Sequence, residues 1–252
     1  MTSDKEKLKV FLKECGIKLG FRGKNIDKYG TFEGEKLTVL TLGTSITVGK
    51  SLSVLPESIG NLTHLRELYL VGLNLESLPE SIGNLSYLEI IQLNDNKLSS
   101  LPESIGNLHS LKTLEINDNN LTSLPQSITK LNNLETLKVN KNNLVIIPDE
   151  IEQLGNLINL FVDGNQLSFL PESIGELSKL RNLGLNGNNF SSLPSSIGKL
   201  TNLKGLWIDK HSFDSLPEEI KRLKEFGCSI FDSKVQGAIN KGISNAFERM
   251  FG

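Results

Sequence analysis

The phrase "LPESIGNL" occupies residues 55–62, and the same eight letters return at 78–85 and at 101–108. The interval is 23 residues each time, and all eight prolines of the chain keep it. A fixed period of roughly 20 to 50 residues is typical of stacked-repeat proteins. The sequence therefore predicts a solenoid. Its prolines are Pro56, Pro79, Pro102, Pro125, Pro148, Pro171, Pro194 and Pro217.

A second phrase lies between the prolines and has the form L-x-x-L-x-L-x-x-N-x-L, as in residues 88–98. Ile91 and Leu93 alternate with polar residues, which predicts a short strand, and strands of successive coils are expected to stack in parallel. Asn96 ends the strand, and its amide can both donate to and accept from buried backbone groups. The predicted structural ladder comprises Asn96, Asn119, Asn142, Asn165 and Asn188.

The proline phrase predicts a short helical turn on the outer side of each coil. Pro102 suits the first helical position, because its φ is fixed and it has no N–H to leave unpaired. Gly106 is interpreted as a left-handed stop for the same turn. Three coils lack this glycine, so longer outer turns are expected there; the residues are Thr129, Glu152 and Lys221.

Together the two phrases, LPxxIxxLxxLxxLxLxxNxL, resemble the leucine-rich repeats, and specifically the 23-residue intracellular type of plant Ras-group, Ras-suppressor and bacterial proteins. The resemblance covers residues 52–226, about seven full repeats and partial ones at the ends. It implies an α/β horseshoe with a parallel β-sheet on the concave side and short helical turns on the convex side. It also implies a non-catalytic module that binds a protein or peptide, a small GTPase-like protein being one candidate.

Residues 1–51 are interpreted as an N-terminal cap, because end repeats of a solenoid need covering. Ser3 and Glu6 form a capping-box signal, and apolar residues at helical spacing follow, so a helix is expected over 4–15. A strand or hairpin is expected over 36–48.

Residues 227–252 are interpreted as a C-terminal cap. The letters "CSIF" at 228–231 predict a degenerate ninth strand, and an amphipathic helix is expected over 234–251. An alternative function is an adaptor that is anchored or oligomerised through this helix.

Composition excludes several classes of function. The net charge is -2, so no basic excess predicts nucleic-acid binding, and two cysteines make no disulfide framework. No apolar run approaches about 18 residues, so no transmembrane segment is expected. Without a signal peptide, a cytoplasmic protein is expected, although unconventional secretion would leave no readable trace.

The stretch "LTLGTSITVGKS" at 40–51 resembles a phosphate-binding loop. Five residues separate Gly43 from Gly49, however, where that loop has four, and no long helix follows. The repeat frame instead places Lys50 and Ser51 in a degenerate first repeat. Nucleotide binding at 43–51 is thus the weakest alternative, and no cofactor is expected.

Other reactive side chains give no catalytic or metal pattern. His64 and His109 are interpreted as exposed loop residues. A column of amides and acids follows the strands but holds too few carboxylates to predict calcium. It comprises Asn94, Asn117, Asn140, Asp163, Asn186 and Asp209.

The free positions on the concave face are the candidate partner-binding residues. Phe161, Gly184 and Trp207 fall in one column, and a slot about 10 Å wide is expected between the two rings over the bare glycine. Acids beside it favour a lysine or arginine guest, whereas the alternative is that the rings pack on each other or on a cap. The predicted partner-binding set is Phe161, Gly184, Trp207, Asp163, Asp209, Asn186, Lys138, Tyr69 and Ile90.

Overall fold

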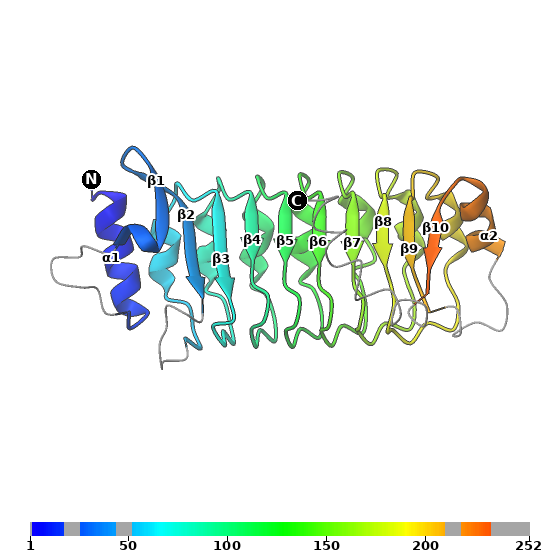
Figure 1. The fold of residues 1–252 in the computed structure, drawn as a ribbon, viewed down its shortest axis with the longest axis horizontal. Coiled ribbons are helices and arrows are strands. Elements are labelled where there is room, and N and C mark those ends of the chain that lie inside the picture. Colours follow the sequence, from blue (N-terminus) through cyan, green and yellow to red (C-terminus); the bar gives the residue numbers. More distant parts are fainter. Residues whose placement is uncertain (1, 18–25, 44–51, 210–217, 233–252) are drawn as a thin grey trace.

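The computed structural model describes residues 2–17, 26–43, 52–209 and 218–232. One ten-stranded sheet runs the length of the molecule, with its strands in the order of the sequence (Figure 1). The first two strands are antiparallel and all later neighbours are parallel. The strands are β1 Gly30–Glu33, β2 Lys36–Gly43, β3 Glu67–Val71, β4 Ile90–Gln92, β5 Thr113–Glu115, β6 Thr136–Lys138, β7 Asn159–Phe161, β8 Asn182–Gly184, β9 Gly205–Trp207 and β10 Ser229–Phe231.

Short helices cover one side of this open sheet, and we call its opposite side the strand face. Two α-helices flank the stack, α1 Asp4–Glu14 and α2 Glu218–Glu225. The other helices are 3₁₀ helices: η2 Ile26–Lys28, η3 Glu57–Asn61, η4 Glu80–Asn84, η5 Glu103–Asn107, η6 Gln126–Lys130, η7 Ile151–Gln153, η8 Glu172–Glu176 and η9 Ser195–Lys199. The predicted repeat solenoid with its parallel sheet is confirmed.

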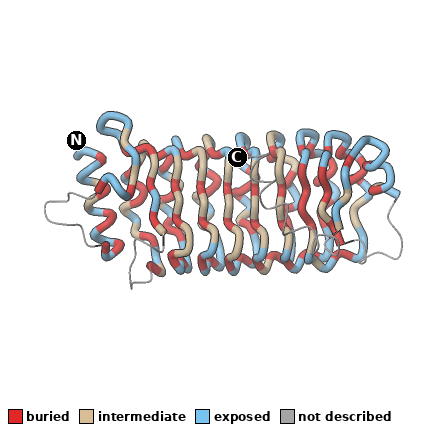
Figure 2. The backbone as a smooth tube through the Cα atoms, viewed as in Figure 1, coloured by how far each residue is buried: buried red, intermediate tan, exposed pale blue. Residues whose placement is uncertain are grey.

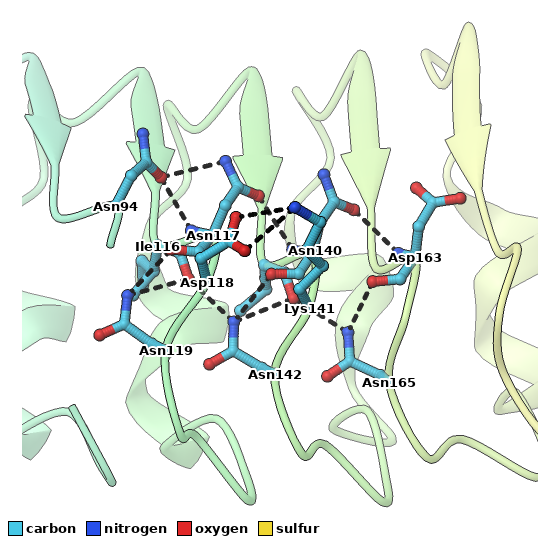
Figure 3. Close-up of polar contacts among 11 residues, drawn as sticks. Asn94, Ile116, Asn117, Asp118, Asn119, Asn140, Lys141, Asn142, Asp163 and Asn165 are labelled. Carbon is cyan, nitrogen blue, oxygen red and sulfur yellow. Dashed lines mark hydrogen bonds and ion pairs between the residues drawn. The ribbon is translucent and has the colours of Figure 1, made fainter. Parts of the chain in front are cut away.

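The apolar repeat positions form one continuous core between the sheet and the 3₁₀ helices (Figure 2). Ile91 and Leu93 are fully buried, as their alternation predicted. Asn142 shows how the coil closes. Its Nδ2 donates to the carbonyl of Ile116 at 2.8 Å (Figure 3). Its Oδ1 accepts the N–H of Leu121 at 2.9 Å. The asparagine ladder is therefore a structural feature that satisfies buried backbone groups.

The outer turns differ from the prediction in two ways. Pro102 is the residue before η5 rather than its first helical residue. Gly106 does not have a positive φ, so it is not a left-handed stop. A Cβ at Gly106 would lie 2.5 Å from the carbonyl oxygen of Ser127 in the next coil. The glycine is needed because neighbouring coils approach closely, not because the helix ends there.

The expectation of longer turns where this glycine is missing is correct at one of three coils. Lys221 lies in the eight-residue helix α2. Thr129 lies in η6, whose five residues match the glycine-containing turns, and Glu152 lies in η7, which has only three. Among these three coils, absence of the glycine coincides with a longer turn only at α2.

The N-terminal helix α1 begins after Ser3, whose Oγ accepts the N–H of Glu6 at 3.4 Å. It ends one residue earlier than expected. The strand expected within 36–48 is β2, and its antiparallel partner β1 lies before it in the chain rather than after it. Because β2 also pairs in parallel with β3, this unit continues the sheet of the repeats.

A buried acid joins α1 to the first repeat. Asp4 is only 4% exposed, and its Oδ2 accepts the N–H of Leu37 at 3.0 Å. Nδ1 of His64 lies 2.8 Å from the same oxygen, so the interpretation of His64 as a simple exposed loop residue was wrong. Burial raises the pKa of the Asp4 carboxyl, but the hydrogen bonds from Leu37, His64 and Lys7 outweigh it and hold that pKa below its ordinary value.

At the other end, the strand expected from "CSIF" is β10, which pairs in parallel with β9. The helix predicted over 234–251 and residues 44–51 of the phosphate-loop-like stretch lie outside the described residues. Self-association through 234–251 and nucleotide binding at 43–51 thus stay predictions. Within the described residues, no helix is both long and apolar enough to cross a membrane.

Candidate interaction surface on the strand face

The strand register builds one central column on the strand face. Phe161 pairs with Gly184, and Gly184 pairs with Trp207, as the 23-residue period predicted. The register also adds a residue at each end that the period did not reveal. The full column is Thr41, Tyr69, Gln92, Glu115, Lys138, Phe161, Gly184, Trp207 and Phe231.

Three rings of this column pack into what we call the aromatic strip, Phe161, Trp207 and Phe231. The centroids of Phe161 and Trp207 are 5.6 Å apart with the planes tilted by 55°. Trp207 and Phe231 are stacked at 4.8 Å with the planes 15° apart. The predicted slot between Phe161 and Trp207 was therefore wrong, because the two rings meet each other. The alternative interpretation, in which the rings of Phe161 and Trp207 pack on each other, agrees with the structure.

Glycines lie beneath these rings and explain the closure. A Cβ on Gly184 would lie 2.6 Å from Cδ1 of Phe161 and 2.1 Å from Oδ2 of Asp163. A Cβ on Gly205 would lie 2.6 Å from Cη2 of Trp207. Each ring thus leans over a glycine and fills the space that a side chain would take. A larger side chain at residue 184 would therefore displace the side chains of Phe161 and Asp163.

The polar column after the strands is a second hydrogen-bond ladder (Figure 3). Asn94 Oδ1 accepts the N–H of Asn117 at 2.8 Å, and Asn117 Oδ1 accepts the N–H of Asn140 at 2.9 Å. Asn140 in turn accepts the N–H of Asp163 at 2.8 Å. Each side chain thereby bonds the equivalent residue of the next coil. The Oδ1 atoms of Asn94, Asn117 and Asn140 are thus directed to backbone N–H groups.

Of the two acids of the predicted site, Asp163 belongs to this second ladder, whereas Asp209 bonds back to the preceding coil. Asp163 Oδ1 accepts the N–H of Asn186 at 2.9 Å, and Asp209 Oδ2 accepts the N–H of Gly187 at 2.5 Å. Burial, with a further contribution from Asp209, raises the pKa of Asp163 to about 6. The slot is closed and these carboxylates bond the backbone, so the structure gives no support to the lysine or arginine guest. Their part in partner binding stays a prediction.

The strand face is hollowed on the other side of Phe161. This hollow has a volume of about 290 Å³. Its floor is polar: Asn159 Nδ2 donates to Thr136 Oγ1 at 3.0 Å. Lys138 and Glu115 of the central column also line it and form an ion pair at 2.8 Å. We call this feature the central hollow; its lining is Thr113, Glu115, Thr136, Lys138, Asn159, Phe161 and Asn182.

Tyr69 and Ile90, the remaining predicted residues, lie at the N-terminal end of the strand face. Six strand spacings separate Tyr69 from Trp207, or about 29 Å. The Tyr69 hydroxyl donates to Glu67 Oε2 at 2.7 Å. Burial, together with Glu67, raises the pKa of Tyr69 to about 12. The predicted residues therefore fall into two groups that one side chain of a partner cannot contact together.

Neither thiols nor clustered ligands supply chemistry in the described part of the chain. Cys15 and Cys228 are free and buried, and burial raises the pKa of Cys15 to about 12 and that of Cys228 to about 11. Thiols with such pKa values are protonated at neutral pH and poorly nucleophilic. Residues 2–17, 26–43, 52–209 and 218–232 contain no group of three or more histidine, cysteine or acidic side chains placed to hold a metal ion.

Comparison with known proteins places this geometry in a family. A leucine-rich repeat region model matches residues 33–121 and 103–178, and a single leucine-rich repeat model matches 179–200. No curated protein sequence matches the chain. A leucine-rich repeat protein of Leptospira interrogans is 36% identical over 71% of this chain, with a TM-score of 0.64. The chain spans 45% of that protein's length.

Two further structures show the same fold. The leucine-rich repeat ectodomain of the receptor kinase GASSHO1/SCHENGEN3 from Arabidopsis thaliana is 30% identical over 66% of this chain and 21% of its own, with a TM-score of 0.59. The leucine-rich repeat domain of the type III effector XopL, 24% identical, covers 92% of this chain and 89% of its own with a TM-score of 0.67, which shows the fold alone.

The matched residues are those that build the coils, the buried asparagine ladder and the sheet. Proteins of this fold are typically non-catalytic scaffolds for protein interaction. The chain belongs to the leucine-rich repeat family.

Proposed function

We propose that the protein binds an extended protein or peptide segment across the strand face, with the segment seated in the central hollow and against the aromatic strip. The observation that carries this proposal is the central hollow itself, a depression of about 290 Å³ lined by residues of the four parallel strands β5 to β8. A surface held by a rigid sheet loses little conformational entropy when a partner binds, so its contacts contribute efficiently to affinity.

The side chains around the central hollow suit a peptide. Threonine and asparagine side chains on the floor can donate to and accept from a peptide backbone. Lys138 and Glu115 offer one charge of each sign, which favours a polar rather than an apolar guest. Phe161 closes one end with an aromatic edge, and aromatic residues are enriched among binding hot spots.

A relative supports this class of function. The structure of the GASSHO1/SCHENGEN3 ectodomain contains CASPARIAN STRIP INTEGRITY FACTOR 2 as its partner, so a leucine-rich repeat array similar to this chain binds a second molecule. The partner of this chain is a protein or peptide by the same reasoning. A small GTPase-like protein is one candidate to include in an assay, because of the resemblance to Ras-group repeat proteins.

The test is capture of partners from source lysate with matched variants. Thr136→Arg fills the floor of the central hollow, and Asn132→Arg places the same side chain on an exposed residue of the same coil that does not line it. We expect the wild type and Asn132→Arg to capture the same partner and Thr136→Arg to lose it. Circular dichroism must first show that all three are folded. A partner retained equally by Thr136→Arg would contradict the proposal.

Trp207→Ala tests the aromatic strip separately. We expect it to weaken partner binding by at least about 2 kcal/mol, the usual hot-spot threshold. Because Trp207 packs between Phe161 and Phe231, the thermal unfolding of the Trp207→Ala variant must be measured alongside its binding. If the variant unfolds like the wild type and binds like the wild type, the aromatic strip is not part of the interface.

A further inference from the structure

A column of charged residues borders the strand face at the position just before each strand. The cations of its N-terminal part are paired with an acid. Glu89 pairs with Arg66 at 3.2 Å and with Lys112 at 2.7 Å, so one acid lies between two cations. We call the set the border column. It comprises Arg66, Glu89, Lys112, Glu135, Ile158, Arg181 and Lys204.

The alternation of charge stops at the C-terminal part of the border column. After Glu135 the alternation calls for a basic residue, but that position is Ile158. Arg181 and Lys204 then occupy the next two coils, with no acid between them in the column. Both cationic side chains are exposed, and neither makes an ion pair within the described residues. Like charges one strand spacing apart, about 4.8 Å, repel each other.

These two cations line a hollow of about 370 Å³, which we call the basic hollow. Lys179 adds a third cation, and its Nζ donates to the neutral Oδ1 of Asn156 at 2.6 Å. Glu176, an acid nearby in sequence, already pairs with Lys199 at 2.8 Å. Among the described residues, no carboxylate lines the hollow. Its lining residues are Ile158, Lys179, Arg181, Asn202 and Lys204.

We propose that the basic hollow binds the carboxylate side chains of an acidic peptide segment. A guanidinium presents paired N–H groups that match a carboxylate, and an anion here relieves the repulsion between Arg181 and Lys204. This inference rests on the proposed function, because Lys204 directly precedes β9, which carries Trp207. A segment lying on the aromatic strip therefore places its next side chains at the basic hollow.

A peptide fits the basic hollow better than a membrane surface does. Membrane binding needs many cations spread over one broad face, with apolar side chains between them. Here three cations converge on one small depression, and the other cations of the border column are paired with Glu89. The inferred partner therefore carries glutamate or aspartate residues beside the stretch that contacts the strand face.

The test uses fluorescently labelled, amidated hexaglutamate peptide and measures anisotropy at low salt and at about 0.15 M salt. The test variant is the double change Arg181→Gln and Lys204→Gln. The matched control is Arg66→Gln with Lys112→Gln, which removes the same number of positive charges from the same border column at residues that are both paired with Glu89. Hexaglutamine, inorganic phosphate as competitor, and phosphatidylserine vesicles complete the set.

We expect the wild type and the Arg66/Lys112 control to bind hexaglutamate with similar affinity, and the Arg181/Lys204 variant to bind at least about tenfold more weakly, a change of about 1.4 kcal/mol. Equal loss in both double variants would mean a response to net charge only and would overturn the inference. Binding of vesicles or phosphate without hexaglutamate would overturn it as well. If hexaglutamate fails to bind while Thr136→Arg still abolishes partner capture, the acidic-peptide inference fails and the strand-face function stands.

Discussion

The carboxylate of Asp163 accepts the backbone N–H of Asn186 at 2.9 Å, one coil further along the solenoid. Asn94, Asn117 and Asn140 use a neutral amide oxygen for the same bond in the preceding coils. The second ladder therefore changes from amides to a carboxylate within an otherwise regular series. Burial and the nearby charge of Asp209 together raise the pKa of the Asp163 carboxylate to about 6.

Replacing this carboxylate with an amide should stabilise the protein at neutral pH. The pKa of Asp163 is about 6 in the folded state, above the unfolded value of about 3.9, so this carboxyl binds its proton more tightly in the folded protein. Wild-type stability accordingly falls as the pH rises from about 4 to about 6, and the loss is complete above that. We expect Asp163→Asn to melt higher than the wild type at pH 7.5 and nearly equally at pH 4.

The melting temperatures of the variant and the wild type are compared by thermal unfolding, monitored by circular dichroism, from pH 4 to pH 7.5. The reverse change, Asn140→Asp, places a carboxylate at the equivalent position one coil earlier and should lower the melting temperature at pH 7.5. A difference between Asp163→Asn and the wild type that stays constant from pH 4 to pH 7.5 would show that the charge is not its cause.

Gly106→Ala should destabilise the protein by about 1–3 kcal/mol, the usual range for overpacking. The added Cβ would lie 2.5 Å from the backbone carbonyl oxygen of Ser127, which cannot move without shifting a whole coil. Gly198→Ala is the matched control, because its Cβ would meet Glu219 Cβ at an ordinary 3.7 Å. Urea denaturation compares the two, and equal effects would argue against close coil packing as the reason for the glycine.

Asp4→Asn should destabilise the protein at pH 7 by about 1–3 kcal/mol, because it weakens the buried hydrogen bonds to Leu37 and His64. The folded-state pKa of Asp4 is depressed, so its stabilising contribution is present above the unfolded value of about 3.9 and is lost as the pH falls through the folded-state pKa. The difference from the wild type should therefore shrink at pH 3. The exposed Asp27, changed to asparagine, is the control and should show little effect at either pH.

The sequence period predicted which residues share a column on the strand face, because parallel strands joined by coils of equal length stay in register. The same reasoning missed Phe231, since β10 pairs with β9 at an offset of 24 residues and leaves the 23-residue frame. The closed slot was missed for another reason. Strand spacing gives the distance between Cα positions, whereas the direction in which Phe161 and Trp207 lean depends on the glycines beside them.

Contacts between coils explain the other differences. Gly106 looks like a helix stop when only its own turn is considered, and the neighbour that requires it, Ser127, belongs to the next coil. His64 and Asp4 are 60 residues apart, and no local pattern in either segment predicts their contact. The basic hollow could have been anticipated, because the loss of alternating charge after Glu135 is visible once the sequence is written in rows of 23.

The identical turns at 56–62, 79–85 and 102–108 make adjoining coils interchangeable. Glu57 accepts the N–H of Ser81 at 3.2 Å, and Glu80 accepts the N–H of Ser104 at 3.1 Å. Excision of residues 79–101 would bring Glu57 against Ser104 in the same arrangement. The contacts between outer turns are therefore kept when a coil is lost or duplicated there, so gene duplication can change the reach of the molecule in increments of about 4.8 Å.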